Sequence, residues 1–358
     1  MAKINNLITV AIDYKGSAFR FYTMTEGNRD SVEYRQVSFS GKLFDDSFYD
    51  QLKEALKEYA AQHPSEGVQK LTLVLPDEAV LTDIVTIPTL RGFGQTKKSL
   101  DATLSGIYRN FKELKFTAYM IEQNKQNSTF MVAAVQKSII SKLCAACSEN
   151  KLLADVLTFA SNTAVYGAVA LDPKLKNESY LLMDLKENHC RLVFVGGGKA
   201  LGFYDLPFGL ELLRQRQVVA QEALFDHSYA QMVVSTAKEK ANSKKMFTLD
   251  EEDSQSAAKK PQREERREKV RSENFQLFAK WAMMLIADNQ RLTAFGKPNF
   301  VCVNLSDDNG DVLDVLNDQE GSGIPFCRLA TDGQPQSVTD NLELYGGLVA
   351  KNITANKF

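Results

Sequence analysis

Short apolar runs separated by turn residues open the chain and predict a compact sequence of strands and one helix. The residues from Asp13 to Ser17 are turn formers between two β-prone runs, which is typical of a hairpin. A later stretch repeats apolar residues at the helical period, and a short apolar run that Pro76 ends follows it. The expected elements are strands over 8–12, 18–23 and 31–40, a helix over 46–62 and a strand over 71–75.

The same order of elements returns in the second half of the chain. Three β-prone runs are separated by turns at Asn188-His189 and at Gly196 to Gly198, and helical sequence follows them. This recurrence predicts an internal duplication. The expected elements are strands over 180–184, 191–195 and 200–206 and helical sequence over 209–230.

Between the two repeats lies a stretch that the duplication does not account for. Its periodicity alternates between strand and helix without the opening triplet of strands. The expected elements are a strand over 83–88, a helix over 99–108, a strand over 130–135, an amphipathic helix over 138–151 and apolar helical sequence over 156–170.

Length, composition and charge exclude several classes of function. At 358 residues the chain is long enough for two lobes, and 44% hydrophobic with 25% charged residues is the composition of a folded protein. A net charge of -2 gives no basic field, so we expect no nucleic-acid partner. No apolar run approaches the length of a membrane span, and basic residues near the end are few, so we expect no direct membrane binding.

Two further features are less decisive. Five cysteines, an odd number, favour free thiols in a reducing compartment, and Cys144 with Cys147 forms a lone CxxC that we interpret as helix core rather than a metal or redox site. Residues 237–273 hold 20 charged residues in 37, 11 basic and 9 acidic. Such a segment buries too little apolar surface to offset its ordering entropy, so we predict a mobile insertion, either a solvated loop or a partner-binding arm.

A duplicated set of strands in which Asp13 ends the first strand resembles the superfamily of actin, sugar kinases and heat-shock ATPases. Leu71 to Pro76 followed by Val85 to Pro88 resembles the entry into the extra subdomain of the PilM and FtsA families, and Val132 to Val135 resembles its exit. Gly346 to Ala350 resembles the start of their C-terminal helix. The resemblance favours a PilM-like protein of type IV pilus assembly and implies an α/β, actin-like (ribonuclease H-like) duplicated two-lobe fold.

The resemblance also implies a division of the chain. The expected parts are the start of the first actin-like lobe (1–76), an inserted FtsA/PilM-type subdomain (77–154), a crossover completing the first lobe (155–179), a second actin-like lobe with the charged insertion 237–273 (180–335), and a C-terminal helix returning to the first lobe (336–358).

In that superfamily, two turns hold the phosphates of ATP with backbone N–H groups, and an aspartate at each turn orients Mg²⁺ through water. By resemblance, the candidate cofactor-binding residues are Asp13, Lys15, Gly16, Ser17, Asp184 and Lys186. Both turns depart from the family pattern. Lys15 and Lys186 stand where glycine allows a phosphate to approach the backbone, so the cradle is obstructed although each lysine offers a cation.

Two other functional positions are altered as well. The residue that orients the attacking water corresponds to Leu157, and the adenosine loop corresponds to Asn304-Leu305-Ser306 where the family has a glycine pair. We therefore predict no catalytic residue, no metal ligand and negligible ATPase activity, with weak binding of ATP and Mg²⁺ left open.

The resulting hypothesis is a PilM-like cytoplasmic scaffold for a pilus or related envelope machine, most simply a pseudo-ATPase. The resemblance implies a partner, the cytoplasmic peptide of a membrane protein of that machine, which would recruit the chain to the inner face of the membrane, and it leaves self-association open. Two alternatives remain at this point: an active actin-fold ATPase or small-molecule kinase, and a structural module of a type II secretion-like machine.

Overall fold

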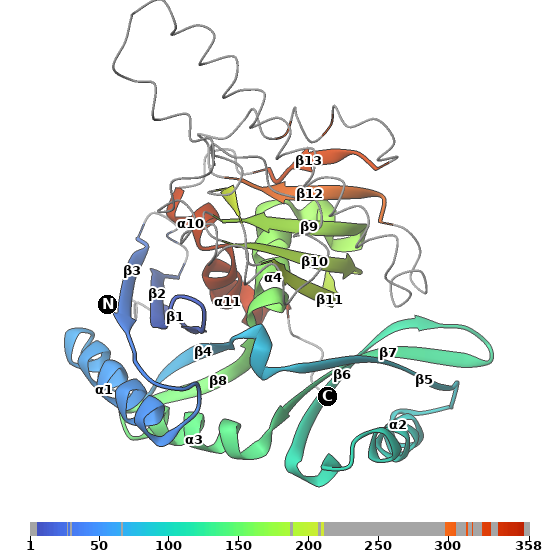
Figure 1. Cartoon of the computed structure of the whole chain (residues 1–358), viewed down its shortest axis with the longest axis horizontal. Helices are drawn as coiled ribbons and strands as arrows, with labels where there is room; N and C mark the ends of the chain where they lie inside the picture. The colour runs from blue at the N-terminus through green and yellow to red at the C-terminus, as the bar shows by residue number, and fades with distance from the viewer. Residues whose placement is uncertain are drawn as a thin grey trace, which may run out of the picture. The chain divides into compact units, whose positions relative to one another are not determined.

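The computed structural model describes residues 6–26, 28, 31–65, 67–186, 189–206, 209–210, 298–305, 313, 317, 324–330 and 336–353. The chain divides into two compact units. The first comprises Met1–Glu178, Val195–Gly202 and Ala330–Phe358, and the second comprises Ser179–Phe194 and Phe203–Leu329. Figure 1 labels their helices and strands.

The core of the first unit is a five-stranded mixed sheet in the order β3-β2-β1-β4-β8. Its first three strands form an antiparallel meander, and β4 and β8 then lie parallel to β1. The strands are β1 Asn6–Asp13, β2 Ala18–Thr25, β3 Glu33–Ser38, β4 Gln69–Leu75 and β8 Leu152–Phe159.

Helices cover both faces of this sheet because its strands are apolar on both sides. On one face, Phe19 of β2 packs against Phe39 and against Phe48 of α1 (Asp46–Gln62), with ring centroids 4.8 and 5.3 Å apart. Asp45 caps that helix by accepting the N–H of Phe48 at 2.7 Å. The alternation of β2 sends Arg20 and Tyr22 to the opposite face.

The opposite face carries α4 (Ala160–Leu171) and α11 (Leu342–Ile353), which lie side by side in Figure 1. Glycine makes their close approach possible: a Cβ on Gly346 would overlap the Thr163 carbonyl oxygen, and one on Gly167 would overlap that of Leu342. The neighbouring Gly347 lies against Thr9 of β1 in the same way. The C-terminal helix is therefore packed directly on the first sheet.

The first unit also contains a separate three-stranded antiparallel sheet in the order β5-β7-β6. The strands are β5 Leu81–Pro88, β6 Leu114–Gln123 and β7 Asn127–Gln136. Leu100 and Leu104 of α2 (Phe93–Ile107) pack on one face of this sheet with Val85, Ile87, Phe130 and Val132. From β7 the chain enters α3 (Lys137–Ser148), which lies next to α1 and leads into β8.

The second five-stranded sheet has the order β11-β10-β9-β12-β13. Its parallel strands are β9, β12 and β13, with β9 central as β1 is in the first sheet. The strands are β9 Ser179–Leu185, β10 Cys190–Gly196, β11 Lys199–Leu206, β12 Phe300–Asn304 and β13 Phe326–Arg328. Position by position this order matches the first sheet, which confirms the predicted duplication of strand topology.

Most of the predicted elements match the structure within a few residues, and α1 has the predicted bounds. The turn at Gly196 to Gly198 is also confirmed, since Gly197 and Gly198 have φ of 57° and 70°. Two interpretations of the sequence are wrong. The helical sequence expected over 156–170 begins only at Ala160, because residues 156–159 belong to β8, and the whole of β6 was not predicted.

Several expected features lie outside the described residues: the helical sequence over 209–230 beyond Leu210, the charged segment 237–273, and Ser306. Among the described residues, no helix is both long and apolar enough to span a membrane.

Candidate nucleotide site: two hairpin turns

The first candidate turn joins β1 to β2 and is held together by Asp13. Asp13 is the last paired residue of β1, opposite Ala18, so the turn comprises residues 14–17. The N–H of Gly16 donates to Asp13 Oδ1 at 2.9 Å, and the N–H of Ser17 donates to the carbonyl of Tyr14 at 3.2 Å. Ser17 has a φ of 47°, a left-handed conformation that glycine would adopt without strain. The N–H groups of both Gly16 and Ser17 thus have partners within the turn.

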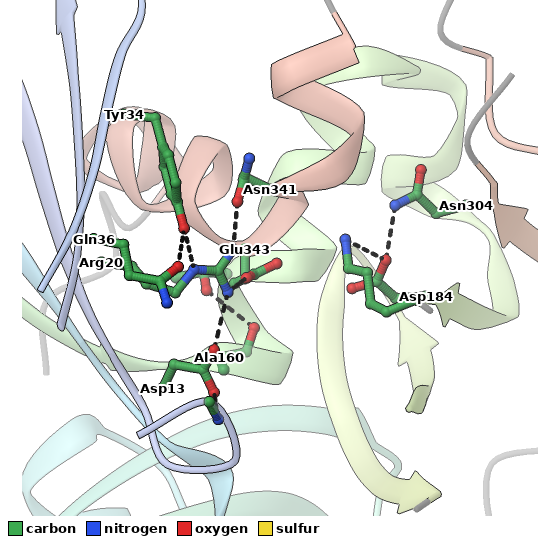
Figure 2. Close-up of polar contacts among 12 residues, drawn as sticks. Asp13, Arg20, Tyr34, Gln36, Ala160, Asp184, Asn304, Asn341 and Glu343 are labelled. Atoms are coloured by element: carbon green, nitrogen blue, oxygen red, sulfur yellow. Dashed lines mark hydrogen bonds and ion pairs between the residues drawn. The ribbon is translucent and has the colours of Figure 1, made fainter. Parts of the chain in front are cut away.

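A second feature of this turn is Arg20, whose guanidinium lies beside the Asp13 carboxylate. Figure 2 shows Arg20 at the centre of a polar cluster drawn from β1, β2, β3 and the start of α11. Its Nη1 atom lies 2.7 Å from Glu343 Oε1 and 3.6 Å from Asp13 Oδ2. Its Nη2 atom donates to Asn341 Oδ1, and its Nε atom donates to the Tyr34 hydroxyl at 3.3 Å.

These contacts form a partly buried electrostatic network, which we call the Arg20 cluster: Asp13, Arg20, Tyr34, Asn341 and Glu343. The side chains of Arg20 and Glu343 are 16% and 6% exposed. Burial disfavours the charged form of Arg20, but the charges of Glu343 and Asp13 and the hydrogen bond with Tyr34 outweigh it and raise the pKa of Arg20 above its ordinary value. Arg20 is therefore a permanent cation in contact with the carboxylate at the end of β1.

The second candidate turn joins β9 to β10 and is built differently. The N–H of Lys186 donates to the carbonyl of His189 at 2.9 Å. Backbone hydrogen bonding across this turn therefore continues two residues beyond Asp184. Asp184 consequently lies inside the strand, and its side chain is fully buried. The carbonyl of Lys186 accepts the N–H of Leu210 at 2.9 Å, and Gly209 has no room for a Cβ against Lys186 and His189.

Two polar side chains contact the Asp184 carboxylate, and both reach the same oxygen. Lys186 Nζ lies 3.1 Å from Asp184 Oδ1, and Asn304 at the end of β12 donates to Oδ1 at 2.7 Å (Figure 2). The parallel pairing of β9 and β12 sets Asn304 directly opposite Asp184. Asp184 Oδ2 is a buried oxygen that has no hydrogen-bond partner among the described residues. The buried carboxylate is thus compensated by the lysine of its own turn.

Neither turn fits a magnesium nucleotide as it stands. A phosphate cradle requires backbone N–H groups that point at the ligand, whereas those of Gly16, Ser17 and Lys186 donate within the protein. A carboxylate that orients hydrated Mg²⁺ requires an unshared charge, whereas Asp13 has Arg20 beside it and Asp184 has Lys186.

The candidate residues predicted from the sequence are divided between the two turns and β8. Asp13, Gly16 and Ser17 share one turn, and Lys15 lies exposed on it. Asp184 and Lys186 form an ion pair in the second turn. Leu157 lies within β8 and pairs with Leu73 of β4, three residues before α4 begins at Ala160.

The sequence did not identify several polar residues that lie in and near these turns. Arg20, Asn341 and Glu343 were not singled out, and Asn304, expected in an adenosine loop, instead donates to Asp184. Asp77, just after β4, accepts the backbone N–H and the hydroxyl of Ser161 and so holds the start of α4. A single charged residue inside the apolar strand β2 was the only local signal for Arg20.

The CxxC pair lies in α3. Cys147 is buried and Cys144 exposed, and burial raises the pKa of Cys147 to about 12. No group of three or more His, Cys, Asp or Glu side chains that could hold a metal occurs among the residues that the structure describes.

Comparison with known proteins agrees with this architecture. No protein-family model and no curated protein sequence matches the chain. Among solved structures, the chain is similar over 99% of its own length and 99% of the other chain to a structure described as the "PilM-PilN type IV pilus biogenesis complex", with 12% identity and a TM-score of 0.58. At that identity the likeness shows the fold alone.

Two more distant structures complete the comparison. The cytoplasmic domain of EpsL from the type II secretion system of Vibrio cholerae is 10% identical, with 63% of this chain and 76% of that chain covered and a TM-score of 0.39. A ROK hexokinase from Thermus thermophilus is 12% identical, with 95% and 98% covered and a TM-score of 0.42. The fold is the actin-like fold, as the resemblance in the sequence implied.

Proposed function

We propose that this chain is a PilM-like scaffold protein that binds a cytoplasmic peptide of a membrane protein in a pilus or related envelope machine, and that it works without hydrolysing ATP. Support for the PilM-like part comes from the likeness over 99% of both chains to a protein solved as a complex with PilN. The proposal includes recruitment to the inner face of the membrane by that partner rather than by a membrane segment of the described residues.

One observation carries the nucleotide-independent part of the proposal. In both turns the groups that would serve a nucleotide already have partners within the protein: Gly16 N–H with Asp13, Asp13 with Arg20, and Asp184 with Lys186. Binding Mg²⁺ and phosphate there would require breaking these pairs, and removing one partner of a buried pair is strongly unfavourable. An actin-like fold stabilised in this way would present the same binding surface to its partner whether or not nucleotide is present.

The three-stranded sheet is the part of the first unit that we assign to partner binding. The strands β5 and β6 form its two edges, each paired with β7 alone among the described strands. An edge strand offers main-chain N–H and C=O groups to an extended peptide. Each edge also carries a half-exposed apolar side chain, Leu81 on β5 and Met120 on β6, which would contact alternate residues of a bound strand.

Peptide titration tests the partner. Fluorescence anisotropy is measured with synthetic peptides that cover the cytoplasmic segments of membrane proteins encoded beside this chain, each with a scrambled control. We expect one peptide to bind, its scrambled form not to bind, and Mg²⁺ with ATP to leave the affinity unchanged. If no such peptide binds, the partner part of the proposal fails; if purified protein turns over ATP, the active-ATPase alternative replaces it. Binding of a segment from a type II secretion protein would instead move the chain to that machine.

A matched pair of variants then locates the peptide. Leu81→Asp and Met120→Asp each place a charge on one edge of the three-stranded sheet, and both side chains are about half exposed, so neither change should unfold the protein. We expect one variant to weaken peptide binding about tenfold or more and the other to leave it unchanged, because a strand adds to one edge only. Equal affinities in both variants would exclude this sheet as the binding site.

A further inference from the structure

We propose that Arg20 is a built-in cation that takes, beside Asp13, the part played by a divalent metal in a nucleotide-binding turn, and that Lys186 does the same beside Asp184. This inference rests on the nucleotide-independent part of the proposed function and explains it by named residues. The first observation is contact: the Arg20 guanidinium lies 3.6 Å from Asp13 Oδ2, and Lys186 Nζ lies 3.1 Å from Asp184 Oδ1.

The position of Arg20 in the fold supports this role. Arg20 pairs with Ala11 across β1 and β2, so its side chain and that of Asp13 lie on the same face of the sheet. Its other contacts, to Glu343 and Asn341 at the start of α11 and to Tyr34 of β3, engage all three guanidinium nitrogens. A side chain held in this way is preorganised and loses little entropy by staying in place.

Charge and burial make the substitution effective. Two carboxylates, Asp13 and Glu343, share the one guanidinium, and Glu343 is nearly fully buried. Without a cation these two negative charges would be left uncompensated in a partly desolvated site. A divalent ion bound by carboxylate oxygens is the alternative means of compensation. The cluster should therefore accept a metal only after the guanidinium has been removed.

The second turn provides an independent instance of the same arrangement. Asp184 is fully buried, and within the described part of the chain its charge is compensated at Oδ1 by Lys186 and by the amide of Asn304, while Oδ2 has no partner there. The two turns use different residues at different positions, Arg20 seven residues after Asp13 and Lys186 two residues after Asp184. Each nevertheless places a protein cation on the aspartate that the fold would use for a metal.

The test is to remove the charge and offer a metal. Arg20→Gln keeps hydrogen-bonding capacity towards Glu343 and Asn341 but has no charge. Mn²⁺ binding is followed by loss of the free-ion signal in electron paramagnetic resonance, and Mg²⁺ binding by thermal unfolding at constant ionic strength. We expect the variant to bind Mn²⁺ and the wild type not to do so. At Mg²⁺ equal to ten times its Kd, the folding equilibrium of the variant should rise about elevenfold.

Two controls make this result specific. Asp13→Asn introduced into Arg20→Gln should abolish the new metal binding, because the carboxylate is then gone. Lys142→Gln removes a lysine that lies 2.9 Å from the exposed carboxylate of Asp46, and it should create no metal site, because that pair is solvated and has no second carboxylate in it.

The outcomes separate cleanly. A folded Arg20→Gln variant that binds no Mn²⁺, or a wild type that binds Mn²⁺ as tightly, overturns the inference. If Arg20→Gln folds only when Mg²⁺ is present, the inference is supported. If it does not fold at all, Arg20→Met, which also keeps both carboxylates, is tested in the same way, and failure of that protein to bind Mn²⁺ or to fold in Mg²⁺ also overturns the inference. Peptide binding by the wild type is measured separately, so failure here leaves the scaffold proposal to its own test.

Discussion

The two five-stranded sheets share one strand order but place different chemistry at the ends of their central strands. In the first sheet, Asp13 is the last residue of β1, partly exposed, and belongs to a cluster that reaches the C-terminal helix. In the second sheet, Asp184 lies inside the strand, fully buried, and its contacts with Lys186 and Asn304 come from its own turn and the adjacent parallel strand. Duplication has preserved the topology while the polar contacts have diverged.

This difference indicates what holds each turn in place. The first turn depends on tertiary structure, because Arg20 contacts residues more than 300 positions away in the sequence. The second combines a local ion pair, between residues two positions apart, with one hydrogen bond from Asn304 of the neighbouring strand. Changes to α11 should therefore disturb the first turn strongly, whereas the second should respond to changes at Lys186.

The largest effect is expected at the contact between α11 and the first sheet. Gly346→Ala places a Cβ on the Thr163 carbonyl, so α4 and α11 must separate, and we expect a loss of about 4 kcal/mol or more in the free energy of unfolding. The control is Gly202→Ala in β11, where a Cβ meets nothing within 4 Å and the effect should stay within about 0.5 kcal/mol. Urea denaturation measures both, and similar losses in the two variants would contradict the glycine-mediated contact.

The next effect concerns the second turn. Lys186→Met leaves the buried carboxylate of Asp184 without its cation, and we expect a loss of about 3 kcal/mol. Lys70→Met is the matched control, because Lys70 lies 3.8 Å from Asp155 in a largely exposed pair that contributes at most about 1 kcal/mol. In a double-mutant cycle, Asp184→Asn should recover most of the stability lost in Lys186→Met. No recovery would mean that Lys186 stabilises the turn by packing alone.

The sequence predicted the first sheet well because its signals are local. The hairpin around Asp13 to Ser17 has turn chemistry between apolar runs, and α1 has a clear helical period with a capping Asp45. The strand β8 was misread because its apolar residues run directly into those of α4, and periodicity does not separate a buried strand from a buried helix. The strand β6 was missed because only Leu114 and Ala118 are buried in it.

The site was predictable only in part, for a related reason. Asp13 and Asp184 were found because each ends an apolar run. The partners that decide their role were not: Glu343 is 323 residues from Arg20, and Asn304 is 120 residues from Asp184. Nothing near Arg20 in the sequence identifies Glu343 as the second carboxylate that it contacts. Pairing across such distances is a property of the tertiary fold.

A smaller loss of stability is expected at Asp77, which follows the end of β4. Asp77 is buried and accepts both the N–H and the hydroxyl of Ser161, at 2.9 and 2.7 Å, so Asp77→Ala leaves two buried donors without a partner. We expect a loss of about 2 kcal/mol. Asp45→Ala removes an N-cap at the start of α1, with its carboxylate 2.7 Å from the N–H of Phe48, and should cost about 1 kcal/mol. Equal losses would show that burial adds nothing to the Asp77 cap.

The smallest effect uses native cysteines to report on the two sheets separately. Cys144 in α3 and Cys327 in β13 are exposed, whereas Cys147 in α3, Cys190 in β10 and Cys302 in β12 are buried. We expect a thiol reagent at pH 8 to modify the exposed pair within minutes and the buried three only on unfolding. Burial raises the pKa of Cys147 to about 12, so only about one molecule in ten thousand would carry its thiolate at pH 8.

Peptide mass spectrometry after brief labelling at increasing urea then compares the sheets. Labelling of Cys147 reports opening beside the first sheet, and labelling of Cys190 and Cys302 reports opening of the second. Since Gly346→Ala acts on the helix that covers the first sheet, it should lower the urea concentration at which Cys147 is labelled more than it does for Cys302. Lys186→Met should have the reverse effect, because its ion pair lies in the second sheet. If both variants shift all three cysteines equally, the sheets unfold as one cooperative unit, and the distinction between tertiary and local support of the two turns loses its thermodynamic basis.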